Sequence, residues 1–132
     1  MTTTSGPPSE PRHIAPSRPV RVVDERTSVA EALQVMRVGG VRHLPVVTDG
    51  RCVGLLVDRD VVAAAVEGVT GPVARWARSP VPTVAPGDPP PVVARAVLAG
   101  GLDAALVVDD GVVIGIVTAT DALAALAEGP AT

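Results

Sequence analysis

Short apolar runs separated by turn residues recur along the chain and predict β-strands. In chain order these runs are residues 20–23, 44–47, 52–57, 81–84, 105–108 and 112–117. Two of the gaps between runs hold an Asp-Gly pair, at Asp49-Gly50 and at Asp110-Gly111, which is the strongest short-range signal for a tight β-hairpin. We therefore expect two hairpins, each preceded by one further strand.

Segments with capping residues predict helices between these strands. Ser28 followed by Glu31 has the pattern of a capping box, and Asp88 before three prolines predicts the start of a second helix. Glycine pairs at residues 39–40 and 100–101 predict the ends of those two helices. A closing helix follows each hairpin, over residues 60–67 and about 119–128. Each half of the chain therefore reads strand, helix, strand, strand, helix.

The two halves also match in sequence, because sliding the chain by 61 positions lays residues 19–62 on residues 80–123 without a gap. Ten of these 44 pairs are identical, and most of the ten lie at turns or strand centres. One unit of about 45 residues buries a single sheet face and is marginal alone. We therefore expect an α+β fold in which two β-α-β-β-α repeats pack by pseudo-twofold symmetry into one compact disc.

The repeats divide the chain into a flexible lead, repeat 1, repeat 2 and a tail, at residues 1–12, 13–68, 69–128 and 129–132. Both closing helices contain a run that is apolar around most of the helix circumference, at residues 61–66 and 122–127. Such helices need two neighbours. Either both helices are wholly buried within the monomer, or their outer faces form a homodimer interface.

Composition limits what this fold can do. The 132 residues are 47% apolar and include one Trp, no Phe and no Tyr, so the core is aliphatic and offers no aromatic platform for stacking bases. The basic residues are all Arg, 11 against 14 acidic residues, and the formal net charge of −3 argues against a nucleic-acid partner. No run reaches the roughly 20 apolar residues that a membrane span requires.

Side chains suited to catalysis are sparse. The chain has two His, one Cys and five Ser, without a nucleophile elbow or a cluster with metal-ligand spacing. Its single Cys52 has no partner for an internal disulfide, which fits a reducing cytoplasm. We expect a cytoplasmic protein that is not an enzyme and that uses no metal or cofactor.

Two segments carry a family resemblance: residues 42–47, Arg-His-Leu-Pro-Val-Val, and residues 115–121, Gly-Ile-Val-Thr-Ala-Thr-Asp. Together with the repeat, they resemble a tandem pair of CBS domains (the cystathionine beta-synthase type), or Bateman module, over about residues 13–128. The resemblance implies a stand-alone sensor whose repeats face each other across a cleft that holds an adenine nucleotide or another adenosyl ligand. It also implies that the occupied state regulates another protein, which the sequence does not identify.

Carried over to this chain, the family pattern assigns binding roles to the second of these segments. The resemblance implies that Asp121 accepts both ribose hydroxyls and that Thr118 and Thr120 contact phosphate or ribose oxygens. It places Ile116 against the purine. A helix cap made by Thr118 and Asp121 is the simpler alternative.

The opposite repeat is expected to complete this pocket through Val41 and Arg42, with residues 13–16 closing over the base. Arg42 and His43 stand where the family often places phosphate-binding residues, whereas repeat 2 has Asp103 at the position of Arg42. For His43 the alternative is an ordinary hydrogen-bonded residue at the start of a strand.

Repeat 1 departs from the pattern, because Val57 stands at the position of the first threonine. The ribose candidate Asp60 is retained, and Arg59 offers a charge in place of the missing hydroxyl. We therefore expect one competent site around Asp121, for a ligand of low negative charge such as AMP, adenosine or S-adenosylmethionine, and a weaker or empty site around Asp60. The rival hypothesis is a dimerisation or scaffold protein whose pockets have degenerated.

Overall fold

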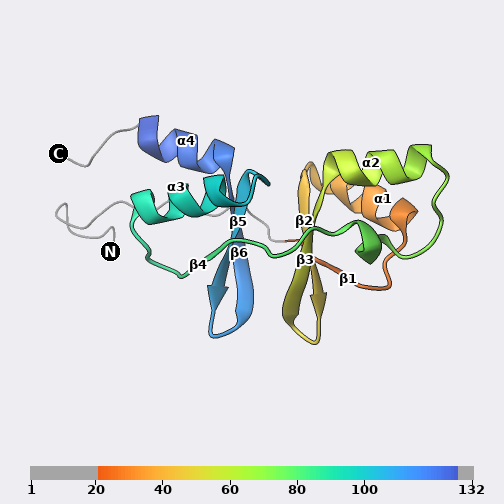
Figure 1. The fold of residues 1–132 in the computed structure, drawn as a ribbon, viewed down its shortest axis with the longest axis horizontal. Helices are drawn as coiled ribbons and strands as arrows, with labels where there is room; N and C mark the ends of the chain where they lie inside the picture. The colour runs from red at the N-terminus through yellow and green to blue at the C-terminus, as the bar shows by residue number, and fades with distance from the viewer. Residues whose placement is uncertain (1–20, 128–132) are drawn as a thin grey trace.

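The computed structural model of the chain describes residues 21–127 (Figure 1). The predicted lead at residues 1–12, the segment 13–16 and the tail at residues 129–132 lie outside the described residues. Residues 21–127 form a mixed α+β structure with two repeats, each of three strands and two helices. The predicted fold class is confirmed.

Repeat 1 has the predicted order of elements. They are β1 (Val23–Asp24), α1 (Val29–Gly39), β2 (His43–Thr48), β3 (Arg51–Val57) and α2 (Asp58–Val66). Strand β1 pairs parallel with β2, and β2 pairs antiparallel with β3. The closing helix begins two residues earlier than predicted, directly after β3.

Repeat 2 follows a 3₁₀ turn, η1 (Val73–Trp76), and has the same topology. Its elements are β4 (Thr83–Val84), α3 (Pro90–Ala99), β5 (Ala104–Asp109), β6 (Val112–Thr118) and α4 (Ala119–Ala127). The sheet order β4-β5-β6 repeats the order β1-β2-β3. In Figure 1 the two hairpins stand next to each other in the centre, and each repeat keeps its helices on the outer side. The layers therefore run helix, sheet, sheet, helix.

The backbone repeats with the same 61-residue offset as the sequence. Both hairpin turns have an Asp-Gly pair at positive φ, 53° and 79° at Asp49-Gly50 and 53° and 80° at Asp110-Gly111. These values are those of the type I′ turn that matches the twist of a hairpin. Each hairpin also has a register shift in its strand pairing, between Val46 and Val47 where β2 pairs with β3 and between Val107 and Val108 where β5 pairs with β6. The duplication therefore extends to local irregularities.

Helix α1 begins and ends as predicted, whereas α3 begins differently. Ser28 and Glu31 form both hydrogen bonds of the capping box, and Gly40 ends α1 in the left-handed conformation, with φ of 63°. The prediction that Asp88 starts α3 is wrong, because Pro89 is the N-cap residue. The Asp88 carboxylate instead accepts a hydrogen bond from the backbone N–H of Ala85, at 2.8 Å. It stabilises the turn before the helix.

Within residues 21–127, three apolar clusters form the core, one inside each repeat and one between them. The cluster between repeats consists of Leu55, Val57, Leu102, Ala104, Leu106 and Ile116. All six are aliphatic and buried, as the composition predicted. Because this cluster joins β3 to β5 and β6, the repeats pack as one unit and hold their strand-to-helix junctions in fixed relative positions.

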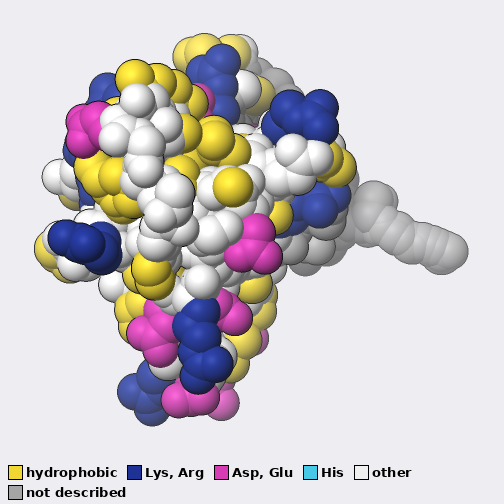
Figure 2. All heavy atoms as spheres, turned by 90° about the vertical axis from the view of Figure 1, so that its right-hand side faces the viewer, with side chains coloured by type: hydrophobic (Ala, Val, Ile, Leu, Met, Phe, Trp, Pro, Cys, Tyr) yellow, Lys and Arg dark blue, Asp and Glu magenta, His cyan; other side chains and the backbone are white. Residues whose placement is uncertain are grey.

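The closing helices are not wholly buried within the monomer, so that alternative is wrong. Val61 and Ala64 of α2 are buried, but Val66 is 81% exposed, and in α4 Leu126 is 54% exposed. Figure 2 shows apolar side chains gathered at the helical end of the repeat 1 face, while acidic and basic side chains mix at the hairpin end. Each closing helix therefore presents an apolar outer face.

Candidate functional site

A cleft of about 890 Å³ lies between the repeats, where the strands end and the closing helices begin. Its walls come from matching segments of the two repeats. Residues 39–43 of repeat 1 stand opposite residues 101–103 of repeat 2, and residues 57–59 stand opposite residues 118–120; Arg21 and Ile116 complete the lining. The cleft therefore lies on the pseudo-twofold axis of the duplicated fold.

The same backbone hydrogen bond shapes both walls. In repeat 1 the N–H of Asp58 donates to the carbonyl of Arg42, and in repeat 2 the N–H of Ala119 donates to the carbonyl of Asp103, each at 2.9 Å. Each bond fixes the first residue of a closing helix to the loop before the middle strand. Because the first N–H groups of a helix have no intrahelical acceptor, both walls present polar backbone groups near the cleft.

The two walls differ in charge, as the sequence predicted. Repeat 1 contributes Arg21, Arg42 and Arg59, together with Asp58, whose Oδ2 lies 3.9 Å from Nε of Arg42. The described lining residues of repeat 2 include Asp103 and no basic side chain. The cleft therefore has one basic wall and one acidic to neutral wall.

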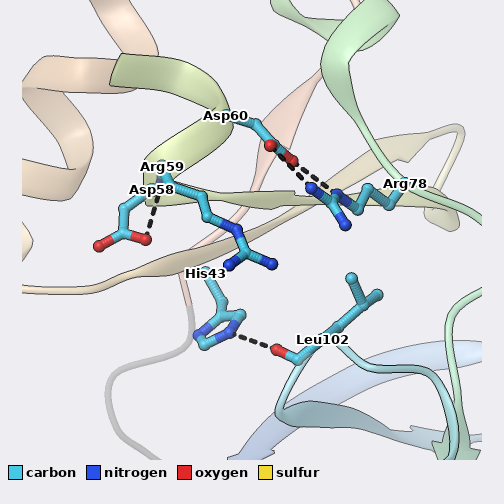
Figure 3. A network of polar contacts seen from close by, with 6 residues as sticks. All are labelled: His43, Asp58, Arg59, Asp60, Arg78 and Leu102. Carbon is cyan, nitrogen blue, oxygen red and sulfur yellow. Dashed lines mark hydrogen bonds and ion pairs between the residues drawn. The ribbon is translucent and has the colours of Figure 1, made fainter. Parts of the chain in front are cut away.

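His43 connects the two repeats across the cleft. Its Nε2 lies 2.9 Å from the carbonyl oxygen of Leu102 (Figure 3). A carbonyl oxygen only accepts, so Nε2 carries the proton and donates. Arg59 extends its guanidinium into the space between this contact and the pair formed by Asp60 and Arg78. His43 is thus a hydrogen-bonded residue and a lining residue at once.

Thr118 and Asp121 form a reciprocal cap at the start of α4. The Asp121 Oδ2 accepts from the N–H of Thr118 at 2.9 Å and from its hydroxyl at 3.1 Å, and Thr118 Oγ1 accepts from the N–H of Asp121 at 3.3 Å. The helix-cap alternative therefore describes a real contact. The cap does not exclude a binding role for Thr118, because Thr118 and Thr120 both line the cleft.

Asp60, the counterpart of Asp121, has a different partner. Arg78 donates from Nε to Asp60 Oδ2 at 2.7 Å and from Nη2 to Oδ1 at 2.9 Å (Figure 3). The hydrogen-bonded guanidinium lowers the pKa of the Asp60 carboxyl below its ordinary value. Arg78 was not among the residues predicted to form the site. One feature of the sequence distinguishes Arg78: when the alignment of the two repeats is extended by two residues, a charged Arg78 aligns with an uncharged Ser17.

The structure brings most of the predicted site residues together. The seven that line the cleft are Val41, Arg42, His43, Arg59, Ile116, Thr118 and Thr120. The two carboxylate candidates, Asp60 and Asp121, are not among the lining residues and lie in the first turn of their helices. Arg21 lines the cleft but was not predicted. It packs against Gly39, where an added Cβ would lie 2.6 Å from the Arg21 Nε.

Residues 21–127 lack two other kinds of feature. No helix in this part of the chain is long and apolar enough to cross a membrane. Among the same residues, no group of three or more His, Cys, Asp or Glu side chains is placed to hold a metal ion.

Comparison with solved structures finds the same architecture. The CBS domain pair of protein MJ0100, in complex with 5′-methylthioadenosine and S-adenosyl-L-methionine, is 26% identical, with a TM-score of 0.72 over 86% of this chain and 92% of that one. CBSX2 in complex with AMP is 27% identical, with a TM-score of 0.72 over 86% and 91%. MJ1225 from Methanocaldococcus jannaschii is 25% identical, with a TM-score of 0.69 over 84% of this chain and 45% of that one.

No curated protein matches the chain. The family described as CBS domain matches it twice, at residues 12–67 and 73–128. These two matches contain the two β-α-β-β-α units and all the residues that line the cleft. The chain therefore belongs to the CBS domain family, as a tandem pair of such domains.

Proposed function

We propose that the cleft binds an adenosyl ligand of low negative charge and that binding regulates a partner protein. The observation that carries the proposal is the cleft itself, built on the pseudo-twofold axis from matched segments of both repeats. A ligand there contacts both repeats at once, so occupancy favours one relative arrangement of the two. The role is binding and signalling rather than catalysis.

The solved relatives support this class of ligand. MJ0100 holds 5′-methylthioadenosine and S-adenosyl-L-methionine, and CBSX2 holds AMP. These ligands share an adenosyl group and differ in charge. The adenosyl group is therefore the part that we expect this chain to recognise. The charges that line the cleft then determine which adenosyl ligand binds most tightly.

In the proposed arrangement, the repeat 2 wall holds the nucleoside and the repeat 1 wall holds any phosphate. Ile116 contacts the purine, and the hydroxyls of Thr118 and Thr120 contact sugar or phosphate oxygens. Asp121 does not line the cleft itself but is hydrogen-bonded to the lining residue Thr118, and we propose that it reaches the ribose beside it. Arg42 and Arg59 face the anionic end, since guanidinium groups bind phosphate in a fixed fork geometry.

The charges of the cleft favour a monophosphate or an uncharged tail over a triphosphate. Among residues 21–127, three Arg and two Asp line it. The small excess of positive charge balances one phosphate, whereas a triphosphate would bring several negative charges close to Asp103 and Asp58. We expect AMP, adenosine or S-adenosylmethionine to bind more tightly than ATP.

Calorimetric titration of the purified chain with AMP, adenosine, S-adenosylmethionine and ATP tests the proposal. We expect binding of at least one of the first three, weakened about tenfold or more by Asp121→Asn, which loses one charge-assisted contact. Asp110→Asn is the matched control, because Asp110 lies in a hairpin turn whose positive φ Asn also adopts. Absence of binding by all four ligands would refute the proposal and favour the scaffold hypothesis.

We propose also that two copies of the chain pair through the closing helices. The exposed apolar residues Val62 and Val66 lie on α2, and Leu123 and Leu126 lie on α4. Apolar faces of this kind on a soluble domain are typical of interfaces. A dimer would place the outer faces of both repeats against a second copy, and a change in the cleft would then alter that contact.

A further inference from the structure

The Asp60 carboxylate is fully engaged by a residue of its own chain. Each of its two oxygens accepts one N–H from the Arg78 guanidinium, at 2.7 and 2.9 Å. A ribose diol needs the same two oxygens, one for each hydroxyl. The guanidinium therefore occupies the acceptors that a sugar would use.

The carboxylate of this pair is the more sheltered partner. The Asp60 side chain is 19% exposed, whereas the Arg78 side chain is 42% exposed. A two-bond contact between a guanidinium and a carboxylate is among the stronger hydrogen-bonded arrangements, because both groups are charged and the fork fits both oxygens. A ligand must displace this contact before Asp60 becomes available.

The backbone holds Arg78 in this place. Residue 78 forms an antiparallel bridge to Leu55 in β3, with N–H to carbonyl bonds of 2.9 Å in both directions. The preceding residue, Ala77, lies close to Gly54, where an added Cβ would come within 2.8 Å of the Ala77 Cβ. Residues 77 and 78 are thus fixed to the hairpin of repeat 1, and this position places the Arg78 side chain next to Asp60.

We propose that Arg78 is an internal competitor that keeps the half-site of repeat 1, residues 57–60, from accepting the sugar of an adenosyl ligand. This inference rests on the proposed function. It assigns Arg78 a role in specificity: the residue decides how many adenosyl groups one chain holds, without taking part in holding any. A competing Arg78 lowers the affinity for the ligand, whereas an Arg78 that bound the ligand would raise it.

The sign of one substitution distinguishes these roles. Arg78→Ser gives repeat 2 the residue that stands at the equivalent position of repeat 1, Ser17. If Arg78 competes with the sugar, calorimetric titration of this variant with AMP shows one additional site per chain, or about tenfold tighter binding where the sites are not resolved. If Arg78 binds the phosphate, the same variant binds AMP more weakly, which would overturn the proposal.

Two variants control the experiment. Arg75→Ser removes an equal charge from the exposed surface of η1 and should leave AMP binding unchanged. In the double variant Arg78→Ser with Asp60→Asn, the gain should disappear, because the carboxylate that was released is gone. A gain that persists without the Asp60 carboxylate would refute the competitor role, and Trp76 fluorescence verifies that each variant is folded.

Failure of this inference differs from failure of the proposed function. Binding of AMP by the wild-type chain with no gain in Arg78→Ser refutes the inference and leaves the function intact. Absence of AMP, adenosine and S-adenosylmethionine binding by the wild-type chain and by every variant refutes the function, and the inference with it. Binding by Arg78→Ser alone would support the competitor role at repeat 1 and would refute the proposed binding by the wild-type chain.

Discussion

Gly54 lies where the segment leading into repeat 2 crosses the hairpin of repeat 1, and replacing it by Ala should be harmful. It is buried in β3, next to Leu55, whose backbone is bonded to that of Arg78. A Cβ on residue 54 would lie 2.8 Å from the Cβ of Ala77 and 3.3 Å from the carbonyl oxygen of Arg78. Neither atom is the free end of a flexible side chain, so Gly54→Ala must push the segment away from β3.

The size of the effect follows from two opposing contributions. Overpacking at a close contact costs about 1–3 kcal/mol. Replacing Gly by Ala recovers about 0.4–1 kcal/mol by restricting the unfolded chain, since Ala adopts a strand backbone without strain. We therefore expect Gly54→Ala to lower the free energy of unfolding by about 1–2 kcal/mol.

Urea unfolding followed by the fluorescence of Trp76, the only Trp of the chain, measures this loss. Ala77→Gly alone should cost about 0.5–1 kcal/mol, because Gly loses more freedom on folding. In the Gly54→Ala background the same change removes the clashing atom and should restore stability. A Gly54→Ala protein as stable as wild type, or two losses that simply add, would contradict the close-contact argument.

Three other contacts give measurable outcomes. His43→Ala removes the hydrogen bond between repeats and should lower the free energy of unfolding by about 0.5–1.5 kcal/mol in urea titrations; an unchanged value would show that the bond contributes nothing. Because Arg78 lowers the folded-state pKa of Asp60, this carboxyl stabilises the fold above its ordinary pKa of 3.8, and the contribution is lost as the pH falls through the lower folded value. The free energy of unfolding should therefore fall less steeply with decreasing pH in Arg78→Ser than in the wild-type chain. Equal slopes would argue that the Asp60–Arg78 ion pair does not stabilise the fold. Val66→Asp with Leu126→Asp should convert a dimer to a monomer in light scattering, and an unchanged mass would exclude the closing helices as the interface.

The fold was predictable because its signals are local. The Asp-Gly pairs require positive φ at two successive residues, and few sequences other than such a pair meet that requirement. Ser28 and Glu31 satisfy each other's backbone groups within one helical turn. Where a local signal failed, at Asp88, the residue type was right for a cap but the following Pro89 took the position. Its carboxylate found another N–H one turn earlier.

The site was only partly predictable, because its decisive contacts join residues far apart in the chain. Arg78 and Asp60 are 18 residues apart, and they meet because residue 78 pairs with Leu55. No periodicity or motif indicates such a bridge. Arg21 was missed for the same kind of reason, since its place in the cleft depends on the absence of a side chain at Gly39. The motif residues of repeat 2 were found because they follow one another in sequence.

Two differences between the repeats have a common physical cause. A carboxylate at the third position of a closing helix needs donors, and in repeat 2 the hydroxyl and N–H of Thr118 supply them to Asp121. Val57 stands at the equivalent position and has no hydroxyl, so Asp60 depends on another group. The Arg78 guanidinium supplies two N–H donors and a compensating charge. The loss of the threonine and the presence of the arginine therefore complement each other, and together they make the two halves of a duplicated cleft chemically unequal.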